Sequence, residues 1–136
     1  MKKIILVTFL LLVSLFVFSQ NAKQLTTKTF KSKIWNFDVD KSWKYVGEKP
    51  AIIYFYTDWS AACKKTTPNF KSLQKQFNGK INFYKVNSDD YPNISVKMGI
   101  REVPVIVFAR KGRSIKKVSG KFSLLKIQSE AGNITK

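Results

Sequence analysis

The segment Trp59-Ser60-Ala61-Ala62-Cys63-Lys64 carries the residue types that thiol chemistry uses. It lies between an apolar run at 51–56 and a stretch of helical spacing that begins near Ser60. A strand that leads into a helix presents unpaired backbone N–H groups and the positive end of the helix dipole. Both favour the thiolate form of a nearby cysteine. We therefore expect any redox chemistry of this chain to take place here.

Cys63 is the only cysteine among 136 residues, and Ser60 stands where a Cys-x-x-Cys pair would have its first cysteine. The chain therefore cannot form an intramolecular disulfide. A serine hydroxyl needs a strong base before it can act as a nucleophile, and the chain contains no histidine. We interpret Ser60 as a helix N-cap, whose hydroxyl accepts a bond from a backbone N–H two or three residues further on. With one cysteine and no histidine, the sequence predicts no zinc, copper or iron site and no cofactor.

The N-terminus has the composition of a secretory signal. Met1-Lys2-Lys3 is followed by a mostly apolar run at 4–18, which ends at Ser19-Gln20. A membrane-spanning helix needs about 20 apolar residues, so this run is too short for an anchor. We expect residues 1–19 to be a signal peptide that is cleaved near Ser19-Gln20. The remaining residues, 20–136, then form one domain that is exported to the periplasm or secreted.

The chain is strongly basic, with a formal charge of +17 at pH 7. Removal of Lys2 and Lys3 with the signal peptide leaves +15. Such an excess favours non-specific contact with anionic surfaces. The lysines are scattered, arginines are few and there is no long basic run, so we do not predict a dedicated nucleic-acid-binding function.

The N-terminal part of the domain suggests one strand and one short helix. Between residues 20 and 37 the residues alternate, with Thr27, Thr29, Phe30 and Ile34 among lysines, which favours a first strand. The segment 38–45, with Asp40 as its N-cap, is expected to form a short helix. A turn at 47–50 follows.

The rest of the chain alternates between strands and helices. Apolar or alternating patterns predict strands at 51–56, 81–86, 103–108 and 114–118. Helical spacing predicts helices at 60–76, 94–98 and 122–131, the first of them kinked by Pro68 and followed by Asn78-Gly79. The order strand, helix, strand implies a right-handed crossover between parallel strands. We therefore expect an α/β domain with a central mixed sheet and helices on both faces.

Taken in order, these residues resemble a thioredoxin. The resemblance rests on the strand 52–56, the segment 58–64, Pro68, Lys85, the segment Gly99-Ile100-Arg101-Glu102-Val103-Pro104, the turn Lys111-Gly112, and Gly120. It covers nearly all of residues 50–131, with a strand and a helix added in front, an arrangement similar to the exported thioredoxin-like proteins of Bacteroidetes-type bacteria. The resemblance implies the thioredoxin fold.

The resemblance also implies that this chain has a degenerate redox site. In the family, the cysteine matched by Ser60 is the exposed nucleophile and the one matched by Cys63 is the shielded, resolving thiol. Tyr54 occupies the position of the family's buried carboxylate, and Ala61-Ala62 replaces the glycine and proline that usually lie between the two cysteines. We therefore expect the dithiol cycle of the family to be lost.

The resemblance implies a docking surface as well. In the family, the backbone of the residue matched by Val103 pairs with an extended substrate peptide. Pro104 is expected to be cis, and Trp59 is expected to form the opposite wall of the groove. The other interpretation of Pro104 is that it only shapes the turn and keeps the strand edge from pairing.

Four interpretations of the site follow from these observations, three of them functional and one purely structural. The first is a module that binds proteins or extended peptides through Trp59, Val103 and Pro104. The second is a single-thiol oxidoreductase that uses Cys63 with an external thiol. The third is a covalent handle, in which Cys63 forms a mixed disulfide with a partner or a second copy. In the fourth, Cys63 only fills the core.

Overall fold

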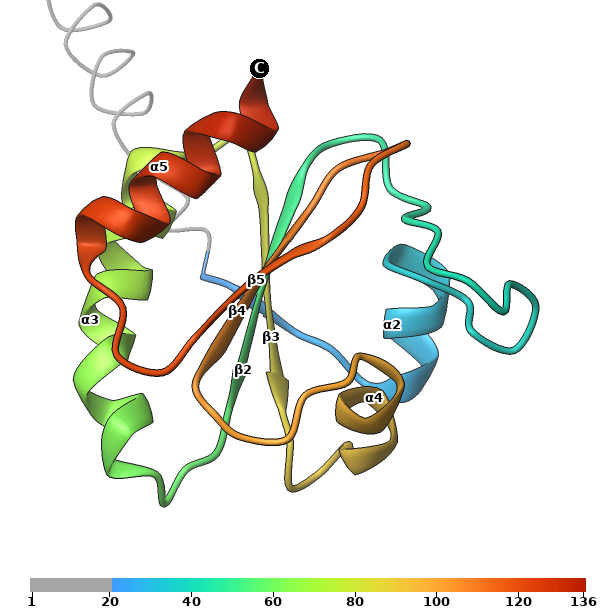
Figure 1. Ribbon diagram of the computed structural model, residues 1–136, viewed down its shortest axis with the longest axis horizontal. Coiled ribbons are helices and arrows are strands. Elements are labelled where there is room, and N and C mark those ends of the chain that lie inside the picture. Colours follow the sequence, from blue (N-terminus) through green and yellow to red (C-terminus); the bar gives the residue numbers. More distant parts are fainter. Residues whose placement is uncertain (1–20) are drawn as a thin grey trace, which may run out of the picture.

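The structure is a computed structural model that describes residues 21–136 (Figure 1). The predicted signal peptide lies outside the described residues. The centre is a five-stranded sheet in the order β1-β3-β2-β4-β5. Its strands are β1 (Lys23–Gln24), β2 (Ala51–Tyr56), β3 (Asn82–Asn87), β4 (Val105–Ala109) and β5 (Lys116–Ser119). The strands β1, β3 and β2 run parallel, whereas β4 is antiparallel to both β2 and β5. The predicted mixed sheet is confirmed.

Two helices cover each face of this sheet (Figure 1). The helices α3 (Ala61–Gln76) and α5 (Leu124–Thr135) pack together on one face. The helices α2 (Thr27–Lys33) and α4 (Pro92–Lys97) lie on the other. Within residues 21–136, no helix is both long and apolar enough to span a membrane.

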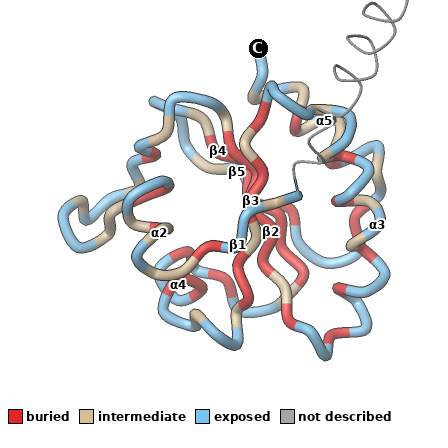
Figure 2. The backbone as a smooth tube through the Cα atoms, turned by 180° about the vertical axis from the view of Figure 1, so that it is seen from behind, coloured by how far each residue is buried: buried red, intermediate tan, exposed pale blue. Residues whose placement is uncertain are grey.

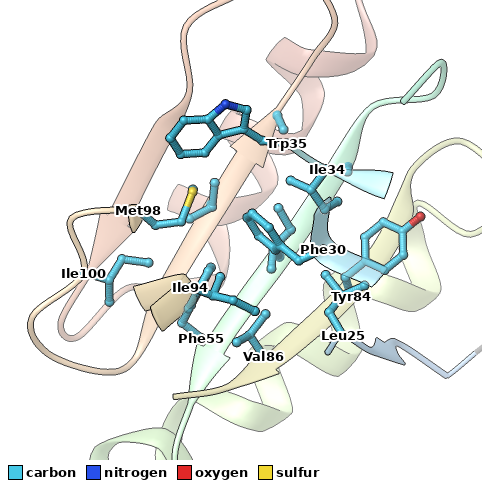
Figure 3. Packing of buried hydrophobic residues seen from close by; sticks show 14 of the residues in the cluster. Leu25, Phe30, Ile34, Trp35, Phe55, Tyr84, Val86, Ile94, Met98 and Ile100 are labelled. Carbon is cyan, nitrogen blue, oxygen red and sulfur yellow. The ribbon is translucent and has the colours of Figure 1, made fainter. Parts of the chain in front are cut away.

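The sheet is buried on both faces, because β2 sends alternate side chains to two separate cores. Ile53 and Phe55 join the core under α2 and α4, which Figure 3 shows, whereas Ile52 and Tyr54 join the core under α3 and α5. Figure 2 shows buried residues concentrated along the strands and exposed residues on the outer surfaces of the helices. The continuous apolar run at 51–56 is explained by this double coverage.

The predicted strand near residues 27–37 is wrong, because Thr27–Lys33 forms α2 and the first strand has only two residues. Thr26 caps the helix: its hydroxyl accepts from the N–H of Thr29 at 3.2 Å, and the Thr29 hydroxyl accepts from the N–H of Thr26 at 2.8 Å. Phe30 and Ile34 are four residues apart and fully buried, as on one helix face. Of the two threonines assigned to the strand, Thr29 forms a capping box with Thr26, and Thr27 is the first residue of the helix.

The predicted helix at 38–45 is also wrong, because this segment forms turns and an irregular loop, and Asp40 caps no helix. The indole N–H of Trp35 donates to the backbone oxygen of Asp40 at 3.1 Å. The ring of Trp43 packs edge-on against Trp35, with 5.6 Å between centroids. The backbone N–H of Val46 then donates to the oxygen of Ile34 at 2.9 Å. These aromatic and backbone contacts fix the loop in a non-helical path.

The remaining elements are confirmed, with ends that differ from the predicted ones by a few residues. Pro68 lies inside α3 as expected. Gly79 follows α3 with φ of +81°, a conformation that glycine adopts without steric cost. The strand β4 begins at Val105, two residues later than predicted, since Val103 and Pro104 lie outside the ladder.

Candidate functional site

The turn between β2 and α3 places Ser60 at the N-cap of α3. Its backbone is extended, and its hydroxyl oxygen accepts from the N–H of Cys63 at 3.2 Å. The backbone oxygen of Ser60 accepts from the N–H of Lys64 at 3.1 Å. The side chain is buried, with 7% of its surface exposed. The predicted capping role of Ser60 is therefore confirmed.

Cys63 lies in the first turn of α3 with its side chain turned into the protein. Only 2% of its surface is exposed, and its thiol is free. It lies on the helix face that also carries Thr66, Phe70 and Leu73, all of them buried. A dissolved disulfide or alkylating reagent has little access to the sulfur in this conformation.

A cluster of hydroxyl groups lies next to Cys63. The hydroxyl of Tyr54 donates to the backbone oxygen of Cys63 at 3.1 Å. It also lies 3.0 Å from the hydroxyl of Thr66 and 3.3 Å from that of Thr67. The hydroxyl of Thr67 donates to the same oxygen of Cys63 at 2.8 Å, and the hydroxyl of Thr66 lies 3.1 Å from that oxygen and 3.1 Å from the backbone oxygen of Ala62. Three hydroxyls therefore converge on one carbonyl.

Burial raises the pKa of the Tyr54 phenol above its ordinary value of 10.0. At neutral pH the side chain is therefore uncharged, and it cannot accept a proton as a carboxylate would. The sequence pointed to Tyr54 but not to its partners. The spacing of Thr66 and Thr67, three and four residues after Cys63, is the signal that could have found them, since this spacing brings hydroxyls back to a carbonyl of the preceding turn.

Trp59 is the exposed aromatic side chain of the site, with 73% of its surface accessible. Its indole N–H donates to a carboxylate oxygen of Asp89 at 2.7 Å. Asn87, at the end of β3, orders this region: its side-chain oxygen accepts from the N–H of Asp89 at 3.0 Å, and its amide donates to Asp58 at 3.3 Å. Sequence reasoning missed Asn87 and Asp89. The pairing of Tyr56 with Asn87 brings the ends of the parallel strands β2 and β3 together.

The peptide bond between Val103 and Pro104 is cis, as predicted. Among residues 21–136, neither the N–H nor the C=O of Val103 makes a hydrogen bond. The oxygen of Pro104 accepts from the N–H of Gly120 at 3.3 Å. Because Phe55 pairs with Val105, this segment lies beside the end of β2 that leads to Trp59. Both backbone groups of Val103 are thus unpaired within the described residues.

Comparison with known proteins identifies the family. The thioredoxin family model matches residues 21–132. The chain is 39% identical to a thioredoxin of Borreliella burgdorferi over 87 residues, which cover 64% of this chain and 74% of that protein. It is 34% identical to an M-type chloroplastic thioredoxin of Pisum sativum over 84 residues, 60% of this chain and about half (49%) of that protein.

A solved structure gives the same result at the level of the fold. The crystal structure of the thioredoxin of Malassezia sympodialis superimposes with a TM-score of 0.70 at 25% identity, covering 85% of this chain and 92% of the other. The architecture is therefore the α/β thioredoxin fold, with five strands and four helices in residues 21–136. Since the family match extends over most of the chain and carries the segments that hold Ser60, Cys63 and Pro104, this protein is a member of the thioredoxin family, with Cys63 as its single cysteine.

Proposed function

We propose that this protein is an exported, redox-impaired thioredoxin-like protein that binds extended segments of other proteins. The observation that carries the proposal is the hydroxyl of Ser60, which occupies the position of the family's nucleophilic thiol and is bonded to the N–H of Cys63. A thiol-disulfide cycle needs a thiolate that attacks a disulfide and a second thiol that resolves the mixed disulfide. One cysteine supplies only half of this chemistry.

The surroundings of Cys63 support the same proposal. The sulfur is almost fully covered, and the position matched to the family's proton-accepting carboxylate holds a neutral phenol, that of Tyr54. Ser60, Tyr54 and the pair Ala61-Ala62 all depart from the family's redox site, and a single substitution of a cysteine would not account for this combination. The shielded position, which the family reserves for the resolving thiol, holds the one thiol that is left.

The binding role is supported by two features that do not need a thiol. Trp59 is exposed and its indole N–H is bonded to Asp89, and the backbone of Val103, next to Pro104, has both its donor and its acceptor free within residues 21–136. An extended peptide that pairs with free backbone groups gains affinity from main-chain hydrogen bonds, and its side chains give specificity. An exposed aromatic residue is a typical anchor for such a ligand.

The alternative is a single-thiol oxidoreductase or mixed-disulfide former that uses Cys63. The observation that favours it is the free thiol of Cys63, which lies in the first turn of α3 at the position of a family redox cysteine. In that reaction the Cys63 thiolate attacks a partner's disulfide, and one partner sulfur leaves as thiolate. An external thiolate then attacks the Cys63 sulfur and the second partner sulfur leaves as thiolate. A second external thiolate attacks the external sulfur bonded to Cys63, which regenerates the Cys63 thiolate and forms a disulfide of the two external thiols. The covered sulfur has to become exposed first.

A binding titration with an array of extended peptides tests the proposal. Trp59→Ala is expected to weaken binding about 30-fold, the loss typical of an interface anchor. Leu125→Ala removes an equally exposed apolar side chain from α5 and serves as the matched control. Cys63→Ser is expected to bind as the wild type does. Equal binding by Trp59→Ala and the wild type would remove the binding role, and loss of binding in Cys63→Ser would favour the thiol alternative.

The predicted export is tested separately. The protein recovered from the culture medium or the periplasm of expressing cells is subjected to N-terminal sequencing. Cleavage near Ser19-Gln20 predicts Gln20 or a neighbouring residue as the first residue. A mature protein that keeps Met1 and stays in the cytosolic fraction would contradict export.

A further inference from the structure

The loop between α2 and β2 protrudes from the side of the molecule that carries α2 (Figures 1 and 2). At its start, the backbone oxygen of Asn36 accepts from the N–H groups of Val39 at 3.1 Å and Asp40 at 2.9 Å, which closes a tight turn. Val39 lies in this turn with 74% of its surface exposed. We call residues 36–46 the turn patch. It lies on the face of the sheet opposite α3, and is thus separate from the site around Ser60 (Figure 1).

Aromatic rings anchor the turn patch to the core. Trp35 is buried, and its ring contacts those of Phe37 and Trp43, with centroid distances of 5.7 and 5.6 Å. The indole N–H of Trp43 is shielded and has no hydrogen-bond partner within residues 21–136. A shielded donor without a partner is unfavourable and is rare in folded proteins. Tryptophan is enriched at membrane interfaces because part of its ring can lie in the apolar layer. Trp43 is half-buried, so part of its ring is accessible from the surface.

Lysines surround the apolar part of the turn patch. The ammonium groups of Lys31 and Lys97 lie over the ring of Phe37, at 5.0 and 5.6 Å from its centroid. Three further lysines next to the turn are exposed: Lys33, Lys41 and Lys44. The two carboxylates of the turn patch are both engaged, Asp38 by Lys31 and Asp40 by Lys44. Residues 36–46 carry two lysines and two aspartates, so the net charge of +3 (five lysines minus two aspartates) comes from Lys31, Lys33 and Lys97 around the turn patch.

We propose that the turn patch binds the surface of a membrane that contains anionic phospholipids. Val39 enters the interface, the ring of Trp43 lies at the level of the headgroups, and the lysines contact phosphates. The turn protrudes from the fold, and its exposed Val39 lies between two aspartates that are ion-paired with Lys31 and Lys44. An exposed apolar side chain with an excess of lysines around it suits a planar anionic surface, whereas a bound peptide would need a groove. Lysines next to such a surface each add to the attraction without specific geometry.

Vesicle co-sedimentation of the full chain tests this proposal, with vesicles of phosphatidylcholine alone and vesicles that also contain phosphatidylglycerol. Each lysine near an anionic surface contributes about 1 kcal/mol, which corresponds to about fivefold in partitioning. The pair Lys41→Glu and Lys44→Glu is therefore expected to lower binding to the anionic vesicles by at least about 25-fold. The pair Lys71→Glu and Lys75→Glu changes the charge equally on the exposed surface of α3 and is expected to have a much smaller effect.

Two further measurements separate binding to lipid from attraction by charge alone. Val39→Asp is expected to weaken binding to anionic vesicles, whereas Leu125→Asp, at an equally exposed apolar position, is expected to leave it unchanged. Equal losses for the two lysine pairs would overturn the proposal, since total charge would then account for the binding. Equal binding to both kinds of vesicle would overturn it as well. If Val39→Asp binds anionic vesicles as well as the wild type does, and the wild type binds soluble polyglutamate as tightly as it binds these vesicles, the lysines would be interpreted as a site for acidic proteins and not for lipid.

Discussion

Replacement of Ser60 by alanine separates the two roles that a serine at this position can have. The substitution removes the hydroxyl that accepts from the N–H of Cys63 at 3.2 Å, and leaves that N–H buried without its partner. A helix N-cap contributes about 1 kcal/mol, within a range of about 0.5–2. Because the site is buried and water cannot easily replace the hydroxyl, we expect a loss of about 1–2 kcal/mol in the free energy of unfolding.

This loss is large enough to measure by thermal or denaturant unfolding. For a domain of this size, 1 kcal/mol lowers the melting temperature by about 3–5 °C. Denaturant titration should show a lower midpoint with an unchanged slope, because the folded structure stays equally compact. Ser60→Asp retains an acceptor for the cap and is expected to recover at least part of the stability, although its carboxylate cannot take the place of a thiolate in disulfide exchange.

The reasoning would be refuted by a Ser60→Ala variant that unfolds at the same denaturant concentration as the wild type. It would also be refuted if Ser60→Ala and Ser60→Asp both kept their stability but both lost the ability to bind peptides or to react with disulfides. In that case the hydroxyl of Ser60 would act in chemistry and not in capping.

Three further predictions concern the interior and the surface of the fold. Tyr54→Phe removes the hydroxyl that contacts a carbonyl and two threonines, and should lower the free energy of unfolding by about 1–2 kcal/mol in a denaturant titration; an unchanged midpoint would mean that the hydroxyl cluster adds nothing. Hydrogen bonding from Lys126 holds the pKa of Glu130 below its ordinary value of 4.5, so its stabilisation is present above pH 4.5 and is lost as the pH falls through the lower, folded-state pKa. The difference in stability between wild type and Glu130→Gln should therefore shrink below pH 4.5, and a difference that grows on acidification would contradict this. Leu73→Ala, at a fully buried position, should cost about 2–5 kcal/mol, whereas Leu125→Ala, at an exposed one, should change stability by less than about 0.5 kcal/mol; equal effects would mean that the core is misassigned.

Much of the fold could be predicted from the sequence, because local pattern and tertiary burial agree there. The run at 51–56 is apolar on both faces and becomes the doubly covered β2. The spacing of Cys63, Phe70 and Leu73 follows the helical period, and these side chains form the buried face of α3. The cap at Ser60 has a local signature as well, since its bond reaches only three residues ahead.

The N-terminal part could not be predicted in the same way, because the same residues fit two local patterns. Threonine favours strands through its branched side chain, but Thr26 and Thr29 use their hydroxyls to cap α2. The path of the loop that follows depends on the packing of Trp43 against Trp35, which no helical or strand period encodes.

The hydrogen-bond partners of the side chains in the site could not be predicted from the sequence for a related reason. The bond from Trp59 to Asp89 joins residues that are 30 positions apart, and it arises from the pairing of β2 with β3. The contact of Tyr54 with Thr66 depends on how α3 packs on the sheet. Such contacts are visible only once the register of the strands and the face of the helix are known.

The accessibility of the Cys63 thiol tests most directly whether the site is redox-impaired. We would measure its rate of alkylation by a small thiol reagent in the folded protein and again in denaturant. With 2% of its surface exposed, Cys63 is expected to react at least about a hundredfold more slowly in the folded protein, because reaction then waits for local opening. Equal rates in the two states, together with disulfide reduction that is lost in Cys63→Ser, would contradict the account and establish a single-thiol enzyme.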